Sequence, residues 1–229
     1  MIRQFPLDLR WPPHQRLDAF WPGANVSALQ GVTEAVHGGS AWLYLHGASG
    51  TGKSHLLIGA CRAAMEANHP ARYVSLAQLP APRSEAIAGL EAEDLLAIDD
   101  AQAIARDREA ERALFDLYNR AKTANARILF AATAPPAELG ITLPDLVSRL
   151  SMCTQYALRP LDDAGRRAML RVLAGRLGLR LDDEVLDWWF ARQPRDPASL
   201  VALLQRIDRA SLAAQRRVTI PFLRELLDE

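Results

Sequence analysis

The sequence predicts an α/β fold, in which a parallel β-sheet with flanking helices is followed by a small all-helical C-terminal domain. Short apolar runs recur at 41–45, 71–76, 95–98 and 128–132, separated by helical or irregular stretches, as in a buried parallel sheet. A complete G-x-x-x-x-G-K-S/T phosphate loop at 47–54 directly follows the first run. Beyond residue 160 the apolar periodicity is helical and no convincing strand is present.

The N-terminal part divides into an extended segment, 1–23, and a nucleotide-binding domain, 24–160. Prolines and aromatic residues interrupt any regular element in the first segment. Helices are expected at 26–37, which Gly38 and Gly39 end, and at 53–67, after the phosphate loop. A short run at 156–158 supplies a fifth strand.

A further helix is expected between the strands at 95–98 and 128–132. Its apolar side carries Leu114, Phe115, Leu117, Tyr118 and Ala121. Helical spacing places Glu109, Glu111 and Arg112 on the exposed face of this helix.

The C-terminal domain, 161–229, is predicted to consist of helices only. Asp162 and Asp163 are suited to cap a first helix that Gly178 ends. The face of this helix is expected to bury Met169, Val172, Leu173 and Leu177. Helices around 183–192 and 200–211 follow, and Thr219 caps a last turn.

Composition excludes several classes of protein. The 229 residues contain 27 basic and 27 acidic side chains, so no global positive field favours direct DNA binding. Cys61 and Cys153 fall in apolar surroundings and are expected to be small buried hydrophobic residues. Without an apolar run of membrane-spanning length or a signal core, a cytoplasmic protein with no membrane partner is expected.

The phosphate loop predicts a nucleotide site. Its glycines, Gly47, Gly50 and Gly52, allow backbone N–H groups, including those at Ser49 and Thr51, to curl around an anion. Lys53 is expected to reach the terminal phosphates, and the Ser54 hydroxyl to coordinate Mg²⁺. His55 follows in the first turn of the helix and completes the expected nucleotide-binding set.

Two carboxylates end the strand at 95–98. Asp99 is expected to hold Mg²⁺ through water, and Asp100 stands where an acid can polarise a water near the γ-phosphate. Two surface aspartates after a strand are common in isolation, but their combination with a complete phosphate loop favours a Walker B strand.

Thr133 and Arg149 are weaker candidates. Thr133 ends the strand at 128–132, and its hydroxyl offers one hydrogen-bond donor as a nucleotide sensor. A purely structural role is about as probable, because threonine is common at the ends of strands. Arg149 lies on a helix that Pro144 and Asp145 open. Such an arginine acts as an arginine finger in some ATPases and is simply solvated in most other helices.

Taken together, the motifs resemble the DnaA-related family of AAA+ proteins, which includes the bacterial replication initiator DnaA and the regulator Hda, and they look closest to Hda. The resemblance covers nearly the whole chain. It rests on residues 20–25, the phosphate loop with 54–57, and residues 98–100, 115–120, 143–150, 208–211 and 219–222.

The resemblance implies ADP or ATP with Mg²⁺ as cofactors and DnaA as partner. Arg149 matches the family's finger position and would act in trans on the ATP of DnaA. Trp21, Pro22 and Asn25 would lie on the adenine side of the chain's own nucleotide, although simple packing explains Trp21 and Pro22 nearly as well.

One departure from the family concerns the chain's own hydrolysis. Ala198 stands at the apparent position of the family's lid sensor arginine, and Arg195, one turn earlier, is the candidate substitute. The chain is therefore expected to hold ADP well and to have weak intrinsic ATPase activity.

The segment 4–9 is similar to the peptides by which Hda and polymerase subunits dock on the β sliding clamp of DNA polymerase III. Gln4 would contact a polar rim, while Phe5, Leu7 and Leu9 supply apolar groups for a groove. An apolar tail that packs on its own core would have the same pattern.

Alternatives to a regulator remain open at this stage. An autonomous ATPase such as a helicase loader of the DnaC or IstB kind is the main alternative, although no extension for DNA or helicase binding is evident. A truncated initiator is disfavoured by zero net charge and by the end of the chain at Glu229, where DnaA continues into a helix-turn-helix. Self-association into a homo-oligomer is also left open.

Overall fold

The computed structural model describes residues 11–12, 14–38, 42–90 and 93–227. The chain divides into two compact units, Met1–Arg159 and Pro160–Glu229. In the described part of the chain, no helix has both the length and the apolar character needed to cross a membrane.

The N-terminal unit contains a five-stranded parallel sheet with the strand order β2-β3-β4-β1-β5, which confirms the predicted α/β architecture. The strands are β1 (Trp42–His46), β2 (Ala71–Ser75), β3 (Leu95–Asp99), β4 (Arg127–Ala132) and β5 (Thr154–Ala157). In register, Leu43 pairs with Leu129 and Ser75 with Asp99, so the carboxyl ends of β2 and β3 lie together.

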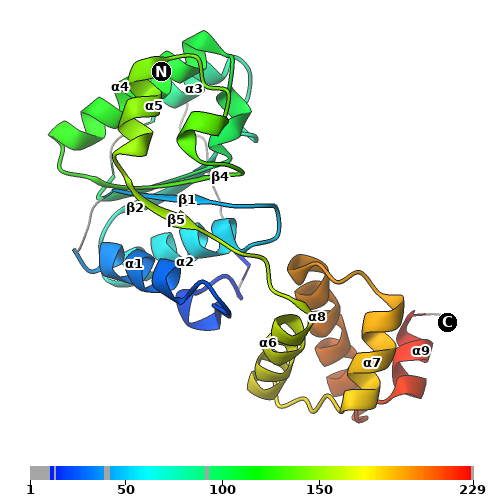
Figure 1. Cartoon of the computed structure of the whole chain (residues 1–229). Helices are drawn as coiled ribbons and strands as arrows, with labels where there is room; N and C mark the ends of the chain where they lie inside the picture. Colours follow the sequence, from blue (N-terminus) through cyan, green and yellow to red (C-terminus); the bar gives the residue numbers. More distant parts are fainter. Residues whose placement is uncertain (1–10, 13, 39–41, 91–92, 228–229) are drawn as a thin grey trace. The chain divides into compact units, whose positions relative to one another are not determined.

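Helices cover both faces of this sheet (Figure 1). They are α1 (Val26–Val36), α2 (Lys53–Glu66), α3 (Arg83–Ala88), α4 (Arg108–Thr123) and α5 (Pro144–Ser151), with short 3₁₀ turns η1 (Leu17–Ala19), η2 (Ala101–Ile104) and η3 (Pro136–Glu138). Alternate strand residues face opposite layers. Leu43 and Leu129 pack in the core with α1 and α2, whereas Tyr44 and Phe130 pack in the core with α4 and α5.

Glu111 is buried, which corrects the prediction that it lies on the exposed face of α4. Its side chain has 0% relative exposure. The carboxylate accepts hydrogen bonds from the backbone N–H groups of Arg106, Thr142 and Leu143 and from the Thr142 hydroxyl, at 2.8–3.0 Å. These donors come from the chain on either side of the helix, and they offset the cost of burying the charge.

Both cysteines are free and buried, as predicted. Burial raises the pKa of the Cys61 thiol and of the Cys153 thiol to about 12. Because the thiolate is the reactive form, both side chains are inert packing groups at neutral pH.

The C-terminal unit is helical, as predicted. It consists of α6 (Asp163–Arg176), α7 (Asp183–Arg192), α8 (Pro197–Ala214) and α9 (Ile220–Leu227). Asp162 caps α6 by accepting from the Gly165 N–H at 2.7 Å, and Asp196 caps α8 by accepting from the Ser199 N–H at 2.9 Å.

The buried face of α6 differs from the predicted one. Met169, Leu170 and Ala174 are buried, whereas Val172 and Leu177 are 40% and 43% exposed. Since α6 packs against α8, the contact follows the stripe through 170 and 174 rather than the one through 172.

Candidate nucleotide-binding site

The phosphate loop joins β1 to α2 and has the backbone of an anion cradle. Gly47, Gly50 and Gly52 all have positive φ angles, of 150°, 77° and 95°. At Gly52, which caps α2, a Cβ would also come within 2.6 Å of the Phe20 ring, so only glycine fits there. The loop is tightened by the Thr51 hydroxyl, which donates to the Ala48 carbonyl at 2.9 Å, while Ser49 and Gly50 are exposed.

Lys53 begins α2 and folds over the loop. Its ammonium group donates to the carbonyls of Gly47 and Ala48 at 2.7 and 2.9 Å. Partial burial lowers the pKa of Lys53, against the opposing effect of the carboxylates of Asp99 and Asp100. Both carboxylates therefore lie close enough to Lys53 to act on its charge, and the binding of a nucleotide by these residues stays a prediction.

Asp99 lies deep in this site. It is 1% exposed, and burial raises the pKa of its carboxyl, although hydrogen bonds from Ser54, Tyr73 and the Asp100 N–H oppose that rise. The Tyr73 hydroxyl donates at 2.9 Å and the Asp100 N–H at 2.8 Å. A buried carboxylate bonded to the Ser54 hydroxyl provides the hard oxygen ligands that Mg²⁺ prefers, so these residues fit a Mg²⁺–nucleotide.

Asp100 is held by its neighbours in a left-handed backbone conformation, with φ 57°. One carboxylate oxygen accepts from the Ser75 hydroxyl at 2.7 Å, and the other from the Gln102 side-chain amide at 3.1 Å. Such backbone strain in a non-glycine residue is common at functional sites.

Thr133 follows β4 and is exposed, and its backbone N–H donates to the side-chain oxygen of Gln102 at 3.2 Å. Gln102 thus touches both Asp100 and Thr133. Gln102, Ser75 and Tyr73 were not among the residues predicted for this site. The available signal was the position of Tyr73 and Ser75 at the end of a strand next to the Walker B strand.

The His55 side chain contacts residues of the chain before α1. Its Nε2 lies 2.8 Å from the Arg16 carbonyl, and its ring contacts Phe20 edge-on at 5.4 Å between centroids. Burial lowers the pKa of His55. These contacts give the side chain a role in packing residues 16–20 against α2.

Asn25 immediately precedes α1, and its side chain binds the backbone at the end of the N-terminal unit. Trp21 and Pro22, a few residues earlier, are half-buried. The Asn25 side chain is 5% exposed, and its amide pairs in both directions with the backbone of Arg159, each bond 2.8 Å long. It therefore fastens the start of α1 to the end of the N-terminal unit. An adenine contact for these three residues stays a prediction.

Arg149 lies on α5, half-buried, with its guanidinium 5.9 Å above the Tyr118 ring. Among the residues that the structure describes, its side chain forms no ion pair or hydrogen bond. Its charge is thus not neutralised by a carboxylate of the described N-terminal unit.

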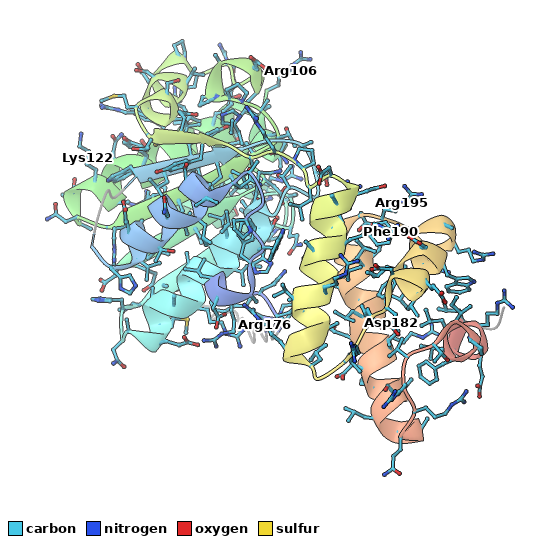
Figure 2. All side chains as sticks on the ribbon, turned by 60° about the horizontal axis from the view of Figure 1, so that its bottom comes forward. Arg106, Lys122, Arg176, Asp182, Phe190 and Arg195 are labelled. Atoms are coloured by element: carbon cyan, nitrogen blue, oxygen red, sulfur yellow. The ribbon has the colours of Figure 1, made fainter. Side chains whose placement is uncertain are left out.

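Arg195 belongs to the C-terminal unit and is engaged there. It donates to the Asp163 carboxylate and to the Phe190 carbonyl, both at 2.8 Å, and lies beside Phe190 in Figure 2. These bonds occupy Nε and one Nη of the guanidinium, and a role of Arg195 toward the nucleotide stays a prediction. The proposed clamp-binding residues Gln4, Phe5, Leu7 and Leu9 lie outside the described residues.

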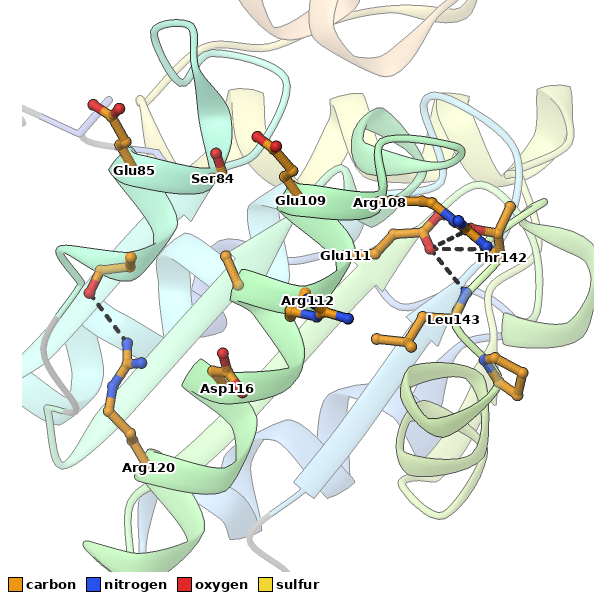
Figure 3. A pocket seen from close by; sticks show the side chains of 13 residues that line it. Ser84, Glu85, Arg108, Glu109, Glu111, Arg112, Asp116, Arg120, Thr142 and Leu143 are labelled. Carbon is orange, nitrogen blue, oxygen red and sulfur yellow. Dashed lines mark hydrogen bonds between the residues drawn. The ribbon is translucent and has the colours of Figure 1, made fainter.

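A separate pocket of about 710 Å³ lies between α3, α4 and the start of α5 (Figure 3). Its lining includes Arg108, Arg112 and Asp116, and the Glu111 hydrogen bonds lie at one end. None of the lining residues belongs to the phosphate loop or to the Walker B strand. The chemistry of the loop, rather than pocket size, therefore locates the nucleotide site.

Comparison with known protein families agrees with this fold. Residues 16–157 match the family model of the bacterial DnaA ATPase domain, and residues 163–227 match that of the Hda lid domain.

Solved structures of DnaA are similar in fold. Domain III of the Thermotoga maritima DnaA superimposes with a TM-score of 0.74 at 21% identity, covering 95% of this chain and 97% of that one. A DnaA bound to AMPPCP and single-stranded DNA gives a TM-score of 0.71 at 22% identity, covering 90% and 69%. The AMPPCP-bound Aquifex aeolicus DnaA gives 0.69 at 24% identity, covering 86% and 65%.

The parallel sheet, the phosphate loop, the Walker B acids and the helical C-terminal unit together define an AAA+ nucleotide-binding protein. Because the DnaA ATPase model covers more than half of the sequence and the Hda lid model most of the remainder, the chain belongs to the DnaA-related family of AAA+ proteins.

Proposed function

We propose that this protein regulates the start of chromosome replication by stimulating hydrolysis of the ATP held by DnaA. It binds ADP or ATP with Mg²⁺ at the phosphate loop, docks on the β sliding clamp through residues 4–9, and works in the cytoplasm. Its C-terminal match to the Hda lid supports a regulator rather than an initiator.

The observation that carries the proposal is the free charge of Arg149. An arginine finger must bring a positive charge to the phosphoryl group of a neighbouring molecule, where charge develops in the transition state. A guanidinium already paired with a carboxylate would have to break that ion pair before it could reach the phosphoryl group. Arg149 has no such partner in the described part of the chain, and stacking near Tyr118 restricts the orientation of its side chain.

The chain's own nucleotide has a different role in this proposal. Lys53 and the loop N–H groups bind its phosphates, Ser54 and Asp99 hold the metal, and Asp100 is the acid nearest the γ-phosphate side. Mg²⁺ supplies charge neutralisation when it is bound. Ala198 at the apparent lid-sensor position, together with Thr133 as first sensor, favours stable ADP binding and weak intrinsic ATPase activity.

A reconstituted hydrolysis assay tests the proposal. DnaA is loaded with labelled ATP, and its single-turnover hydrolysis is followed with β clamp loaded on DNA, with and without this protein. We expect faster hydrolysis only when both the clamp and this protein are present. An unchanged rate would contradict the proposal.

Intrinsic hydrolysis tests the main alternative. Rapid single-turnover hydrolysis of ATP by the isolated protein, persisting in Arg149→Ala, would support an autonomous ATPase such as a helicase loader. Slow hydrolysis with tight ADP binding is the result expected of the regulator.

A further inference from the structure

The side chain of Gln102 connects the ends of two neighbouring strands, β3 and β4, at the proposed nucleotide site. It lies in η2, one turn after the Walker B strand. Its amide nitrogen donates to one carboxylate oxygen of Asp100 at 3.1 Å, and its amide oxygen accepts from the Thr133 N–H at 3.2 Å. One planar group thus bridges the end of β3 and the end of β4.

The bridge needs an amide with this orientation. Asp100 presents a carboxylate, which only accepts, and the Thr133 N–H only donates. A flipped amide would direct its oxygen at the carboxylate and its NH₂ at the N–H group, losing both bonds. Among the standard side chains of this length, glutamine alone supplies a donor and an acceptor on one rigid plane.

The rest of the Asp100 carboxylate is also restrained. Ser75, at the end of β2, donates to the other oxygen at 2.7 Å, and the backbone at Asp100 is left-handed. Each carboxylate oxygen accepts one of these two hydrogen bonds, which restrains the carboxylate and leaves lone pairs for a water. Ser75 and Gln102 therefore tie three neighbouring strand ends to one acid.

We infer that Gln102 is a positioning residue that couples Asp100 to Thr133, so that the protein distinguishes a triphosphate from a diphosphate nucleotide. The inference rests on the proposed nucleotide site and adds a residue to it. Without the bridge, the Thr133 N–H loses its acceptor and the end of β4 is less restrained. Contacts to a γ-phosphate should weaken, whereas contacts of the loop to the α- and β-phosphates should not.

Two substitutions separate hydrogen bonding from packing. Gln102→Met keeps the length of the side chain and removes both hydrogen bonds. Gln102→Glu keeps an acceptor for the Thr133 N–H and places a second carboxylate beside Asp100. Gln155→Ala is the control, since it removes an exposed glutamine of β5 whose amide donates to the backbone carbonyls of Leu150 and Cys153.

The first measurement is the affinity for Mg²⁺–AMPPCP and for Mg²⁺–ADP. Losing one or two ordinary hydrogen bonds corresponds to an affinity loss of about three- to tenfold. We expect that loss for AMPPCP in Gln102→Met, a larger one in Gln102→Glu, and ADP affinities equal to that of the wild type. Equal losses for both nucleotides, or none in either variant, would overturn the inference.

The second measurement needs no nucleotide. Amide hydrogen exchange at Thr133 should be faster in Gln102→Met than in the wild type and unchanged in Gln155→Ala. Unchanged exchange at Thr133 would overturn the bridge itself. A wild-type protein that binds neither nucleotide would overturn the proposed site together with this inference, whereas normal binding with unaltered discrimination in both variants overturns only the role of Gln102.

Discussion

At the scale of single residues, Glu111 shows how a charged side chain becomes part of the core. Burial alone would raise the pKa of this carboxyl, but hydrogen bonds from Thr142, Arg106 and Leu143 outweigh burial and lower it. The ionised form is therefore favoured in the folded state. Its contribution to stability is present above the ordinary glutamate pKa and is lost as the pH falls through the lowered value.

We expect Glu111→Gln to destabilise the protein. The new NH₂ group would face N–H donors, leaving at least one buried donor unsatisfied, at a cost on the order of 3 kcal/mol in the free energy of unfolding. Urea denaturation at neutral pH measures this change. Glu109→Gln, on the exposed side of the same helix, should be nearly neutral, and equal effects of the two substitutions would contradict the account.

His55 predicts a dependence of stability on pH. Burial lowers its pKa below 6.5 and the positive charge of His14 contributes, while the Arg16 carbonyl and Asp18 oppose the shift. The unfolded chain therefore takes up a proton first as the pH falls. Stability from His55 is complete above the unfolded pKa and declines as the pH falls from there toward the lower folded value.

Comparing urea midpoints at about pH 7.5 and pH 5.5 tests this sign, since the unperturbed histidine pKa of about 6.5 lies between them. The wild type should lose stability at the lower pH. His14 and His46, whose pKa values are also lowered by burial, contribute in the same direction, so His55→Gln should reduce the loss without abolishing it. A pH dependence identical to that of the wild type would exclude His55 as a contributor.

The sequence was sufficient for those site residues that lie close together in the chain. The loop around Lys53 and the acids at the end of β3 are contiguous motifs, and in the structure both acids lie close enough to Lys53 to act on its charge. The bonds of Ser75 to Asp100, of Thr133 to Gln102 and of Thr142 to Glu111 join residues 25 to 31 positions apart. These residues become neighbours only through strand pairing and loop return. No local pattern encodes those distances.

At the scale of elements, α2 is held on its outer side by the chain before α1. A Cβ at Gly59 would lie 3.0 Å from both a Leu17 methyl carbon and the Leu17 backbone nitrogen. Arg16 forms an ion pair with Glu66 in the last turn of α2, at 2.8 Å. The absence of a side chain at Gly59 thus lets residues 16–17 lie directly on the helix that the phosphate loop begins.

A matched pair of glycine substitutions tests this packing. Gly175 lies in α6 with nothing near its missing Cβ, so Gly175→Ala should gain about 0.5–1 kcal/mol of stability from helix propensity. Gly59→Ala has the same propensity gain but should be destabilising overall by about 1 kcal/mol, because the backbone of Leu17 must move. Thermal or urea unfolding measures both, and a stabilised Gly59→Ala would refute the close approach.

The apolar patterns predicted whether a segment is a helix or a strand more reliably than they predicted which face of a helix is exposed. Strands β1 to β4 and the helices of the C-terminal unit were predictable because apolar strands and capped helices have strong local signals. The largely exposed β5 begins at Thr154, two residues before the predicted run 156–158. The buried face of α6 was not predictable in this way. Apolar residues such as Val172 and Leu173 occur on neighbouring faces of the helix, and packing against α8 determines which face is buried. The same limit applies to α4, where a glutamate at an apparently exposed position turned out to be buried.

At the scale of the whole molecule, the N-terminal peptide and the AAA+ core are expected to have separable functions. Replacing Gln4, Leu7 and Leu9 with alanine should abolish binding to the β clamp, because these residues supply the rim and groove contacts of the proposed peptide. Affinity for ADP should be unchanged. Surface plasmon resonance on immobilised clamp measures clamp binding, and nucleotide titration measures ADP affinity. Clamp binding equal to that of the wild type would show that the peptide is not the docking segment.

Arg149 carries the central claim that this protein completes the ATPase site of another. The most direct measurement is the clamp-dependent, single-turnover hydrolysis of ATP on DnaA with Arg149→Ala, using Arg112→Ala, an exposed arginine on α4, as the control. Arginine fingers contribute roughly 10³- to 10⁵-fold to such rates, so Arg149→Ala should lose nearly all stimulation while folding, clamp binding and ADP binding remain normal. Arg112→Ala should stimulate like the wild type. Full stimulation by Arg149→Ala would contradict the account.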